Sequence, residues 1–231
     1  LAREQRAREI TEREQGIQQA RLKTWQERNA YRQGWHDGMA YAAREWWHSQ
    51  GITDESIDWY GLGARPYPIT NGNGETLNLV AYTIPIHDPQ TWEVVNMQYR
   101  IDNPPQGFGK YKQETGLPAR SFYTKPHTFE DVLIVEGAKK AIVLDQLLGG
   151  TMQIVGLPGI TPSERLIDEL KGYKRKYFLP DPDVTAAPLK RFADRLQNLR
   201  VVRLPVKPDD AVNAYGMTRE DLREWMMQYR N

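Results

Sequence analysis

The strongest constraint on the fold is an apolar run, Val132-Leu133-Ile134-Val135, which ends on Glu136 and Gly137. A short run of apolar, mostly β-branched residues is typical of a parallel strand that is buried on both faces. The carboxyl end of such a strand lies at the edge where open α/β sheets bind their ligands. We therefore expect Glu136 to lie at a ligand-binding edge of a parallel sheet.

Two further acidic segments follow runs with strand character. The run 176–179 precedes Asp181 and Asp183, and the run 200–204 leads toward Asp209 and Asp210. Each pair alone has an ordinary explanation as surface charge in a turn. Because parallel strands end at one edge of a sheet, the three acidic segments together favour a single metal site.

Helices and strands alternate through this half of the chain. Helices are expected over 139–148, 163–170 and 186–196, between strands over 132–136, 152–157, 176–179 and 200–204. This alternation predicts an α/β fold with a parallel sheet flanked by helices. A last helix over 218–228 begins with Thr218 and an acidic residue in a capping-box pattern.

The N-terminal half has a different character. Residues 1–34 are rich in Arg, Glu, Gln and Ala, which favours a solvated helical linker or arm; a basic arm that contacts phosphates is the alternative. Residues 35–130 predict a mixed α+β subdomain, with a helix over 35–51, a short helix ending near Tyr60, and a hairpin of strands 77–86 and 92–101. The domain with the parallel sheet is expected at 131–216, and a C-terminal helix is expected at 217–231.

Basic and aromatic residues alternate after the hairpin. The basic candidates for contacts with nucleic acid are Arg100, Lys110, Lys112 and Arg120, and aromatic residues such as Tyr99, Phe108 and Tyr111 lie among them. Cations neutralise phosphates and aromatic faces stack on unpaired bases, so the pattern indicates a single-stranded nucleic-acid surface. A loop with amphipathic side chains at the surface is the alternative.

The segments "VEGAKKA", "LPDPD" and "LPVKPDDAV" occur in this order, and together they resemble the Toprim domain of DnaG-type primases, above all those of phages and mobile elements. The resemblance extends over roughly residues 35–216 and includes "QGITDESIDWYGLG" and the Lys110-Tyr111 pair. It implies a catalytic core that makes short RNA primers from nucleoside triphosphates on single-stranded DNA, with Mg²⁺ or Mn²⁺. Lys140 stands where many such primases have an aspartate, so the resemblance does not imply the number of metal ions.

The resemblance also implies roles for individual residues. Glu136, Asp181 and Asp183 are the expected catalytic residues, and with Asp209 and Asp210 they are the expected metal ligands. Glu136 could instead act as a base. Lys139 and Lys140 follow Glu136 at the start of a helix, where they are expected near phosphates or at a solvated surface.

Other functions are alternatives to primer synthesis. A Toprim nuclease of the OLD type would use the same carboxylates for hydrolysis. A non-catalytic module that binds single-stranded nucleic acid is the second alternative. A topoisomerase needs large strand-passage domains, for which 231 residues leave no room.

Composition narrows the setting. The chain has no cysteine, which excludes disulfides and cysteine-ligated zinc within it, and its net charge of +1 restricts any nucleic-acid surface to a local patch. No signal peptide or membrane span is evident, so we expect a location in the cytoplasm of a bacterial host. Because the chain opens on Leu1 in a helical pattern, we expect a fragment of a longer protein. A replicative helicase and an upstream zinc-binding module are its expected partners.

Overall fold

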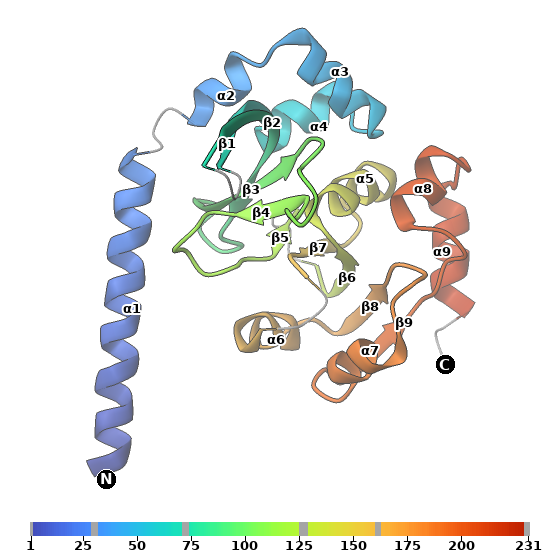
Figure 1. Ribbon diagram of the computed structural model, residues 1–231. Coiled ribbons are helices and arrows are strands. Elements are labelled where there is room, and N and C mark those ends of the chain that lie inside the picture. Colours follow the sequence, from blue (N-terminus) through green and yellow to red (C-terminus); the bar gives the residue numbers. More distant parts are fainter. Residues whose placement is uncertain (1, 29–31, 71–73, 125–128, 160–162, 229–231) are drawn as a thin grey trace. The chain divides into compact units, whose positions relative to one another are not determined.

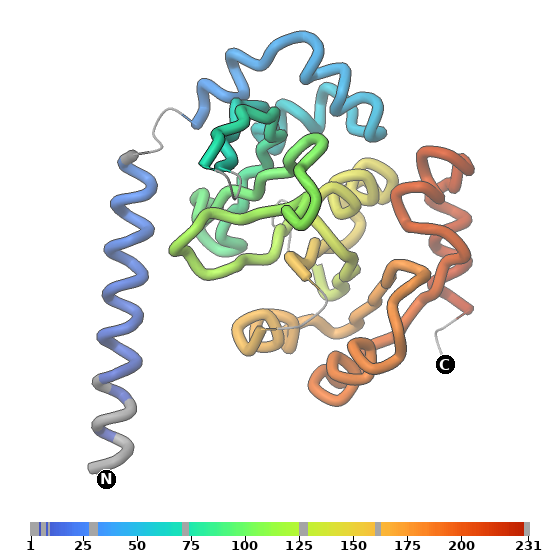
Figure 2. Tube along the Cα trace, viewed as in Figure 1, coloured from blue at the N-terminus to red at the C-terminus, as the bar shows by residue number. Residues whose placement is uncertain are grey.

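The computed structural model describes residues 2–28, 32–70, 74–124, 129–159 and 163–228. These residues form two compact units that alternate along the chain, and Figure 2 follows the backbone through both. Unit 1 comprises residues 1–44, 58–85 and 94–119, and unit 2 comprises residues 45–57, 86–93 and 120–231. No helix in the described part of the chain is long and apolar enough to cross a membrane.

Helices come first along the chain. The N-terminal helices are α1 (Ala2–Arg28), α2 (Gln33–Asp37), α3 (Tyr41–Ser49) and α4 (Asp54–Tyr60). The prediction of one helix over 35–51 is therefore wrong, because the chain is not helical at Gly38 and the segment forms two helices, α2 and α3. Gly34 and Gly38 both lie in this segment, and glycine is a poor helix former.

The first sheet has the strand order β1-β2-β3-β4. Its strands are β1 (Gly63–Thr70), β2 (Thr76–His87), β3 (Val94–Ile101) and β4 (Tyr111–Gln113). The predicted hairpin corresponds to β2 and β3, which are neighbours in the sheet. Strand β4 lies within the basic and aromatic segment that the sequence indicated only as a loop, and it pairs antiparallel with β3.

One face of this sheet carries the core of unit 1. Ile69, Met97 and Tyr99 are buried there, and Trp25 and Leu22 of α1 pack against the same cluster. Ile10 and Ile17 of α1 stay exposed. The C-terminal part of α1 is therefore anchored in this core, whereas a fully solvated linker was the expectation.

The second sheet has the strand order β5-β7-β6-β8-β9 (Figure 1). Its strands are β5 (Phe122–Tyr123), β6 (Asp131–Glu136), β7 (Gln153–Leu157), β8 (Arg175–Leu179) and β9 (Leu199–Val201). β7, β6, β8 and β9 are parallel and β5 is antiparallel. The predicted parallel strands are confirmed, but β9 ends at Val201, earlier than expected.

Helices alternate with these strands and follow them along the chain. They are α5 (Ala138–Leu148), α6 (Glu164–Lys171), α7 (Ala186–Ala193), α8 (Pro208–Asn213) and α9 (Arg219–Gln228). Leu166 and Ile167 of α6 and Phe192 of α7 form one cluster with Ile134 and Phe178 of the sheet. The central strand β6 is buried from Val132 to Val135, which explains why its sequence is apolar without alternation.

Candidate active site

The site begins where β6 ends. Glu136 is the last residue of β6, and Gly137 after it has a φ of 88°, a left-handed conformation that glycine adopts without strain. Gly137 donates its N–H to the Leu157 carbonyl at 2.9 Å, which ties the turn to the neighbouring strand. The turn lets α5 start immediately, so Glu136 and the first turn of α5 lie at the same edge of the sheet.

Glu136 contacts the end of the next strand directly. Its Oε1 accepts the backbone N–H of Asp181 at 3.0 Å, and Asp181 follows β8, the parallel neighbour of β6. The ends of these two neighbouring strands are therefore joined by a side-chain hydrogen bond.

Asp181 is also paired with a lysine of α5. Lys140 Nζ donates to Asp181 Oδ2 at 2.7 Å and lies 2.6 Å from Oδ1, and both side chains are only 13% exposed. Because the pair is shielded from water, its attraction is stronger than that of a surface ion pair. Lys140 is thus paired with one of the predicted metal ligands, and its low exposure contradicts the solvated surface that was one of the two expectations for it.

A second lysine holds a second acid. Lys139 Nζ lies 2.9 Å from Asp209 Oδ2 and donates to Gln50 Oε1 at 3.1 Å. The side chain of Asp209 is 6% exposed, and its Oδ1 is buried without a hydrogen-bond partner in the described part of the chain. Such an atom is costly to bury unless a ligand, ion or water completes it.

Asp209 and Asp210 are placed differently from the expectation. They do not follow a strand directly but lie in the first turn of α8, well beyond the end of β9. Asp183 and Asp210 are exposed. Among the described residues, no three His, Asp or Glu side chains converge as a ready set of metal ligands.

The residues nevertheless suit a magnesium ion. Mg²⁺ keeps several waters and is commonly held by one or two carboxylates together with substrate phosphates, so a cage of three acids is not required. Among the described residues, the buried Oδ1 atoms of Asp181 and Asp209 both lack a hydrogen-bond partner, and carboxylate oxygens are ligands of the kind that Mg²⁺ prefers. Further carboxylates are those of Glu136 at the end of β6, Asp183 after β8 and Asp210 in α8.

The predicted basic residues divide between the units. In β3 and β4, Tyr99 pairs with Lys112 and Arg100 with Tyr111, and the carbonyl of Lys110 accepts the Ile101 N–H at 2.9 Å. Arg100 forms an ion pair with Asp102 at 3.0 Å. Lys112 lies over the Phe108 ring, 4.7 Å from its centroid.

Arg120 belongs to unit 2, whereas Arg100, Lys110 and Lys112 belong to unit 1. Burial lowers its pKa, as does the nearby Arg165, while Glu169 and Asp88 raise it. Arg120 therefore lies in a partly buried charge network rather than in an open basic groove.

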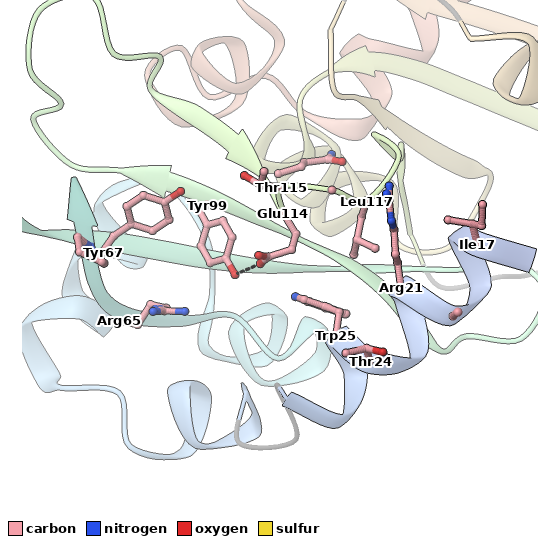
Figure 3. Close-up of a pocket in the computed structure, with 14 residues that line it drawn as sticks. Ile17, Arg21, Thr24, Trp25, Arg65, Tyr67, Tyr99, Glu114, Thr115 and Leu117 are labelled. Carbon is pink, nitrogen blue, oxygen red and sulfur yellow. Dashed lines mark hydrogen bonds between the residues drawn. The ribbon is translucent and has the colours of Figure 1, made fainter. Parts of the chain in front are cut away.

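Unit 1 also contains a pocket that the sequence did not indicate (Figure 3). Its volume is about 900 Å³, and its lining combines Arg21 of α1 with Arg65, Tyr67, Tyr99 and Glu114. The Tyr99 hydroxyl donates to Glu114 Oε2 at 2.7 Å, and the Tyr67 and Tyr99 rings lie 5.2 Å apart. Pockets with an aromatic floor and a few converging charged groups commonly bind ligands.

A signal for this pocket exists in the sequence. Arg65, Tyr67 and Ile69 alternate with Pro66 and Pro68, which places the first three on one face of a strand. The two prolines argued against a strand here, because proline lacks the N–H that a sheet needs and is confined to sheet edges. β1 is indeed at an edge of its sheet.

Comparisons with known proteins define the fold. No protein-family model matches the chain, and no curated protein sequence matches it significantly. Solved structures do match, and they show that the chain shares its fold with DNA primase domains.

The zinc-binding and RNA polymerase domains of Aquifex aeolicus primase match 82% of this chain with a TM-score of 0.62 and 19% identity. A DNA primase domain from Pseudomonas aeruginosa matches 81% of this chain and 71% of its own, with a TM-score of 0.58 and 20% identity. The primase fragment of the bacteriophage T7 primase-helicase matches 79% of this chain and 72% of its own, with a TM-score of 0.52 and 15% identity. This chain spans 56% of the Aquifex chain. The expected resemblance to primases is confirmed at the level of the fold.

Proposed function

We propose that this chain is the catalytic core of a DnaG-type primase of the Toprim class, which makes short RNA primers from nucleoside triphosphates on single-stranded DNA. The hydrogen bond from the Asp181 N–H to Glu136 Oε1, at 3.0 Å, carries the proposal, because it joins two acidic strand ends at the edge where open α/β sheets bind ligands. The fold shared with primase domains supports the same reading.

In this proposal the carboxylates serve a divalent cation, Mg²⁺ or Mn²⁺. The residues that would hold it are chosen from Glu136, Asp181, Asp183, Asp209 and Asp210. When bound, such an ion neutralises phosphate charge and helps a hydroxyl attack the α-phosphate of the incoming nucleotide. Glu136 uses Oε1 to fix Asp181, which leaves Oε2 for a metal or for the proton of the attacking hydroxyl.

Each unit contributes basic residues that are candidates for substrate contacts. Lys139 lies beside Asp209, within the first turn of α5, and we propose that it contacts the triphosphate. Arg100, Lys110 and Lys112 would contact template phosphates, with Arg120 and Lys140 as the other basic residues of the candidate site. Such contacts weaken as salt rises, because binding releases the counterions of the nucleic acid.

The pocket in unit 1 offers a place for an unpaired template base. Tyr67 is half-buried, with its ring next to that of Tyr99, so a base could stack against it while Glu114 accepts from the base's amino or imino groups. Tyr67→Ala should weaken binding of single-stranded DNA, whereas Tyr215→Ala, which removes an exposed tyrosine of unit 2, should not.

A replicative helicase and an upstream zinc-binding module are the partners we propose, and the cytoplasm of a bacterial host is the proposed location. Two of the similar structures carry such modules in their names: the Aquifex protein includes a zinc-binding domain, and the T7 fragment derives from a primase-helicase.

Incorporation of labelled ribonucleotides on single-stranded DNA tests the proposal. Wild type, with Mg²⁺ and with Mn²⁺, is compared with Glu136→Ala and with the double variant Asp181→Ala, Asp183→Ala. Asp168→Ala is the control, because Asp168 is an exposed acid paired with Lys171 on α6. We expect metal-dependent products from wild type and the control and at least a hundredfold less from the site variants, the scale on which loss of positioned catalytic groups acts.

The other outcomes separate the rivals. Degradation of the template would indicate a nuclease that uses the same carboxylates. Binding of DNA without synthesis or degradation, under both metals, would indicate a non-catalytic nucleic-acid-binding module. Either result would refute primer synthesis as the activity of this chain.

A further inference from the structure

The carboxylate of Glu114 is held in a fixed position in the pocket of unit 1 (Figure 3). Its Oε2 accepts the Tyr99 hydroxyl at 2.7 Å, and the Glu114 backbone N–H donates to Asn96 Oδ1 at 3.1 Å. Asn96 is completely buried, and its Nδ2 donates to the Pro118 carbonyl at 3.0 Å, so one side chain of β3 holds the segment after β4 at two points. A carboxylate fixed in this way is preorganised for a ligand, since little conformational entropy remains to be lost.

Aromatic rings lie beside this carboxylate. The ring centroids of Tyr67 and Tyr99 are 5.2 Å apart, and the buried Trp25 of α1 also lines the pocket. The volume of about 900 Å³ lies within the range of small-molecule sites. Flat rings next to a fixed acceptor suit a planar ligand that carries hydrogen-bond donors.

The charges in the lining disfavour a cationic ligand. Arg21 and Arg65 line the pocket together with Glu114, so positive charge exceeds negative charge there. The Arg65 guanidinium already lies 4.5 Å from the ring centroid of Trp35 and 5.9 Å from that of Tyr99. A planar ligand that is neutral or linked to a phosphate therefore fits best, and a nucleotide has these properties.

We propose that this pocket selects guanine among the bases. The inference rests on the proposed function for the presence of a nucleic-acid template, and it adds the identity of the base that unit 1 binds. The guanine can belong to the template strand or to a free nucleotide, because both present the same base.

The pairing edges of the bases decide the choice. An ionised carboxylate only accepts hydrogen bonds. Guanine presents two adjacent donors on its pairing edge, the N1–H and the N2 amino group, and one carboxylate can accept both. Adenine and cytosine each have a ring-nitrogen acceptor beside their amino group, and thymine has its single N–H between two carbonyls. Each of these three bases would therefore bring an acceptor against Glu114, and a mismatch of two hydrogen bonds weakens binding by about tenfold or more.

Binding of the whole chain to thymine oligonucleotides with one central variable base tests the proposal. Fluorescence anisotropy in EDTA compares guanine, hypoxanthine, adenine and cytosine at that position, and GMP, IMP, AMP and CMP compete with the guanine strand. We expect about tenfold tighter binding of guanine than of adenine or cytosine. Hypoxanthine, the base of IMP, lacks the N2 amino group and should lose most of the preference without any change in the protein.

The two arms distinguish the sources of the base. A guanine preference among the strands would assign the pocket to the template. A preference confined to the monophosphates would assign it to a free guanine nucleotide. Both results support the selection of guanine.

A variant of Glu114 locates the preference in the pocket. Glu114→Gln keeps an acceptor for Tyr99 but adds an amide donor, which suits the pairing edge of adenine, so guanine should bind no more tightly than adenine. Glu27→Gln alters an exposed acid of α1 outside the pocket lining and should keep the preference of wild type.

Equal binding of all bases in both arms, equal binding of guanine and hypoxanthine, or a guanine preference that survives Glu114→Gln would each overturn the proposal. These measurements use neither nucleoside triphosphates nor metal ions. A chain that prefers guanine but makes no primer would refute the proposed function and leave this inference standing. A chain that makes primers but binds all bases alike would do the reverse.

Discussion

The hydroxyl of Tyr99, in strand β3, donates a 2.7 Å hydrogen bond to the carboxylate of Glu114, the residue that follows strand β4. Tyr99 is buried, and burial, followed by the hydrogen bond and charge of Glu114, raises its pKa far above the ordinary value of 10.0. The same contact closes one side of the pocket in unit 1.

Tyr99→Phe should lower the free energy of unfolding by about 1.5–3 kcal/mol, because a buried hydrogen bond to a charged group is lost. Urea unfolding near pH 7 measures the change. Tyr111→Phe, which alters an exposed tyrosine, should have little effect.

The raised pKa of Tyr99 means that its contribution to stability is complete below pH 10 and falls as pH rises above it, since only the unfolded chain releases this proton readily. Tyr99→Phe should show a shallower fall, and an unchanged slope would contradict the assignment.

Gly156→Ala should disturb the turn that carries Glu136. A Cβ at Gly156 would lie 2.7 Å from the Gly137 carbonyl oxygen and 2.9 Å from the Ala138 Cα, and both are backbone atoms. We expect a loss of about 1–3 kcal/mol in stability, the usual cost of overpacking, and reduced primer synthesis. Gly159→Ala is the matched control, because a Cβ there meets nothing within 4 Å. Equal effects of the two substitutions would argue against the close approach of these backbones.

Ser163 is a working helix cap and Thr185 is not. The Ser163 side chain accepts the Leu166 N–H at 3.2 Å at the start of α6, whereas Thr185 begins α7 without a side-chain cap. Ser163→Ala should therefore cost about 1 kcal/mol, and Thr185→Ala should cost much less. Chemical denaturation of both variants measures the difference, and a larger loss for Thr185→Ala would contradict the cap geometry.

Lys176 carries a charge into the second sheet. It is 4% exposed, its Nζ donates to the Tyr173 carbonyl at 2.5 Å, and burial lowers its pKa. Lys176→Met should keep or raise the melting temperature at pH 7, because the methionine needs no buried charge. Lys174→Met, at an exposed lysine, is the control.

The pH dependence of Lys176 has the opposite sign to that of Tyr99. Because the folded pKa is lowered, the unfolded chain binds more protons, so this group makes stability increase with pH up to about 10.5, its ordinary value. Lys176→Met should remove that increase. A melting temperature several degrees below wild type at pH 7 would show that the ammonium group is needed instead.

Lys110 and Lys112 should act through phosphate charge alone. Lys110→Ala and Lys112→Ala should each weaken binding of single-stranded DNA at all sequences and reduce the slope of log affinity against log salt by about 0.7, the value for one phosphate contact on a single strand. Fluorescence anisotropy at several salt concentrations measures both quantities. Lys171→Ala, on an exposed pair of α6, should leave the slope unchanged, and a shared change would indicate a nonspecific effect of charge.

Sequence alone predicted the parts of the fold that carry strong periodic or apolar patterns. The strands around Ile134 and Phe178 were predicted correctly because burial on both faces requires continuous apolar runs. The edge that bears Glu136 and Asp181 followed from those strands.

The remaining features have weak local signals. β4 and β5 are only three and two residues long, too short to show alternation. The helix α8 that carries Asp209 is six residues long and begins at a proline that also suits a loop. Lys140 and Asp181 are 41 positions apart in the chain, so no local sequence pattern predicts that they pair.

The order in which the chain visits its two units limits how the protein can be divided. Residues 45–57 and 86–93 belong to unit 2 although they lie among segments of unit 1. A truncation at residue 120 would keep the second sheet but remove Gln50, which contacts Lys139, and Gly51 and Thr53, which contact Gln146. A single cut therefore cannot separate the sheet edge at Glu136 from the N-terminal half of the chain, and genetic exchange could transfer that edge intact only together with residues 45–57.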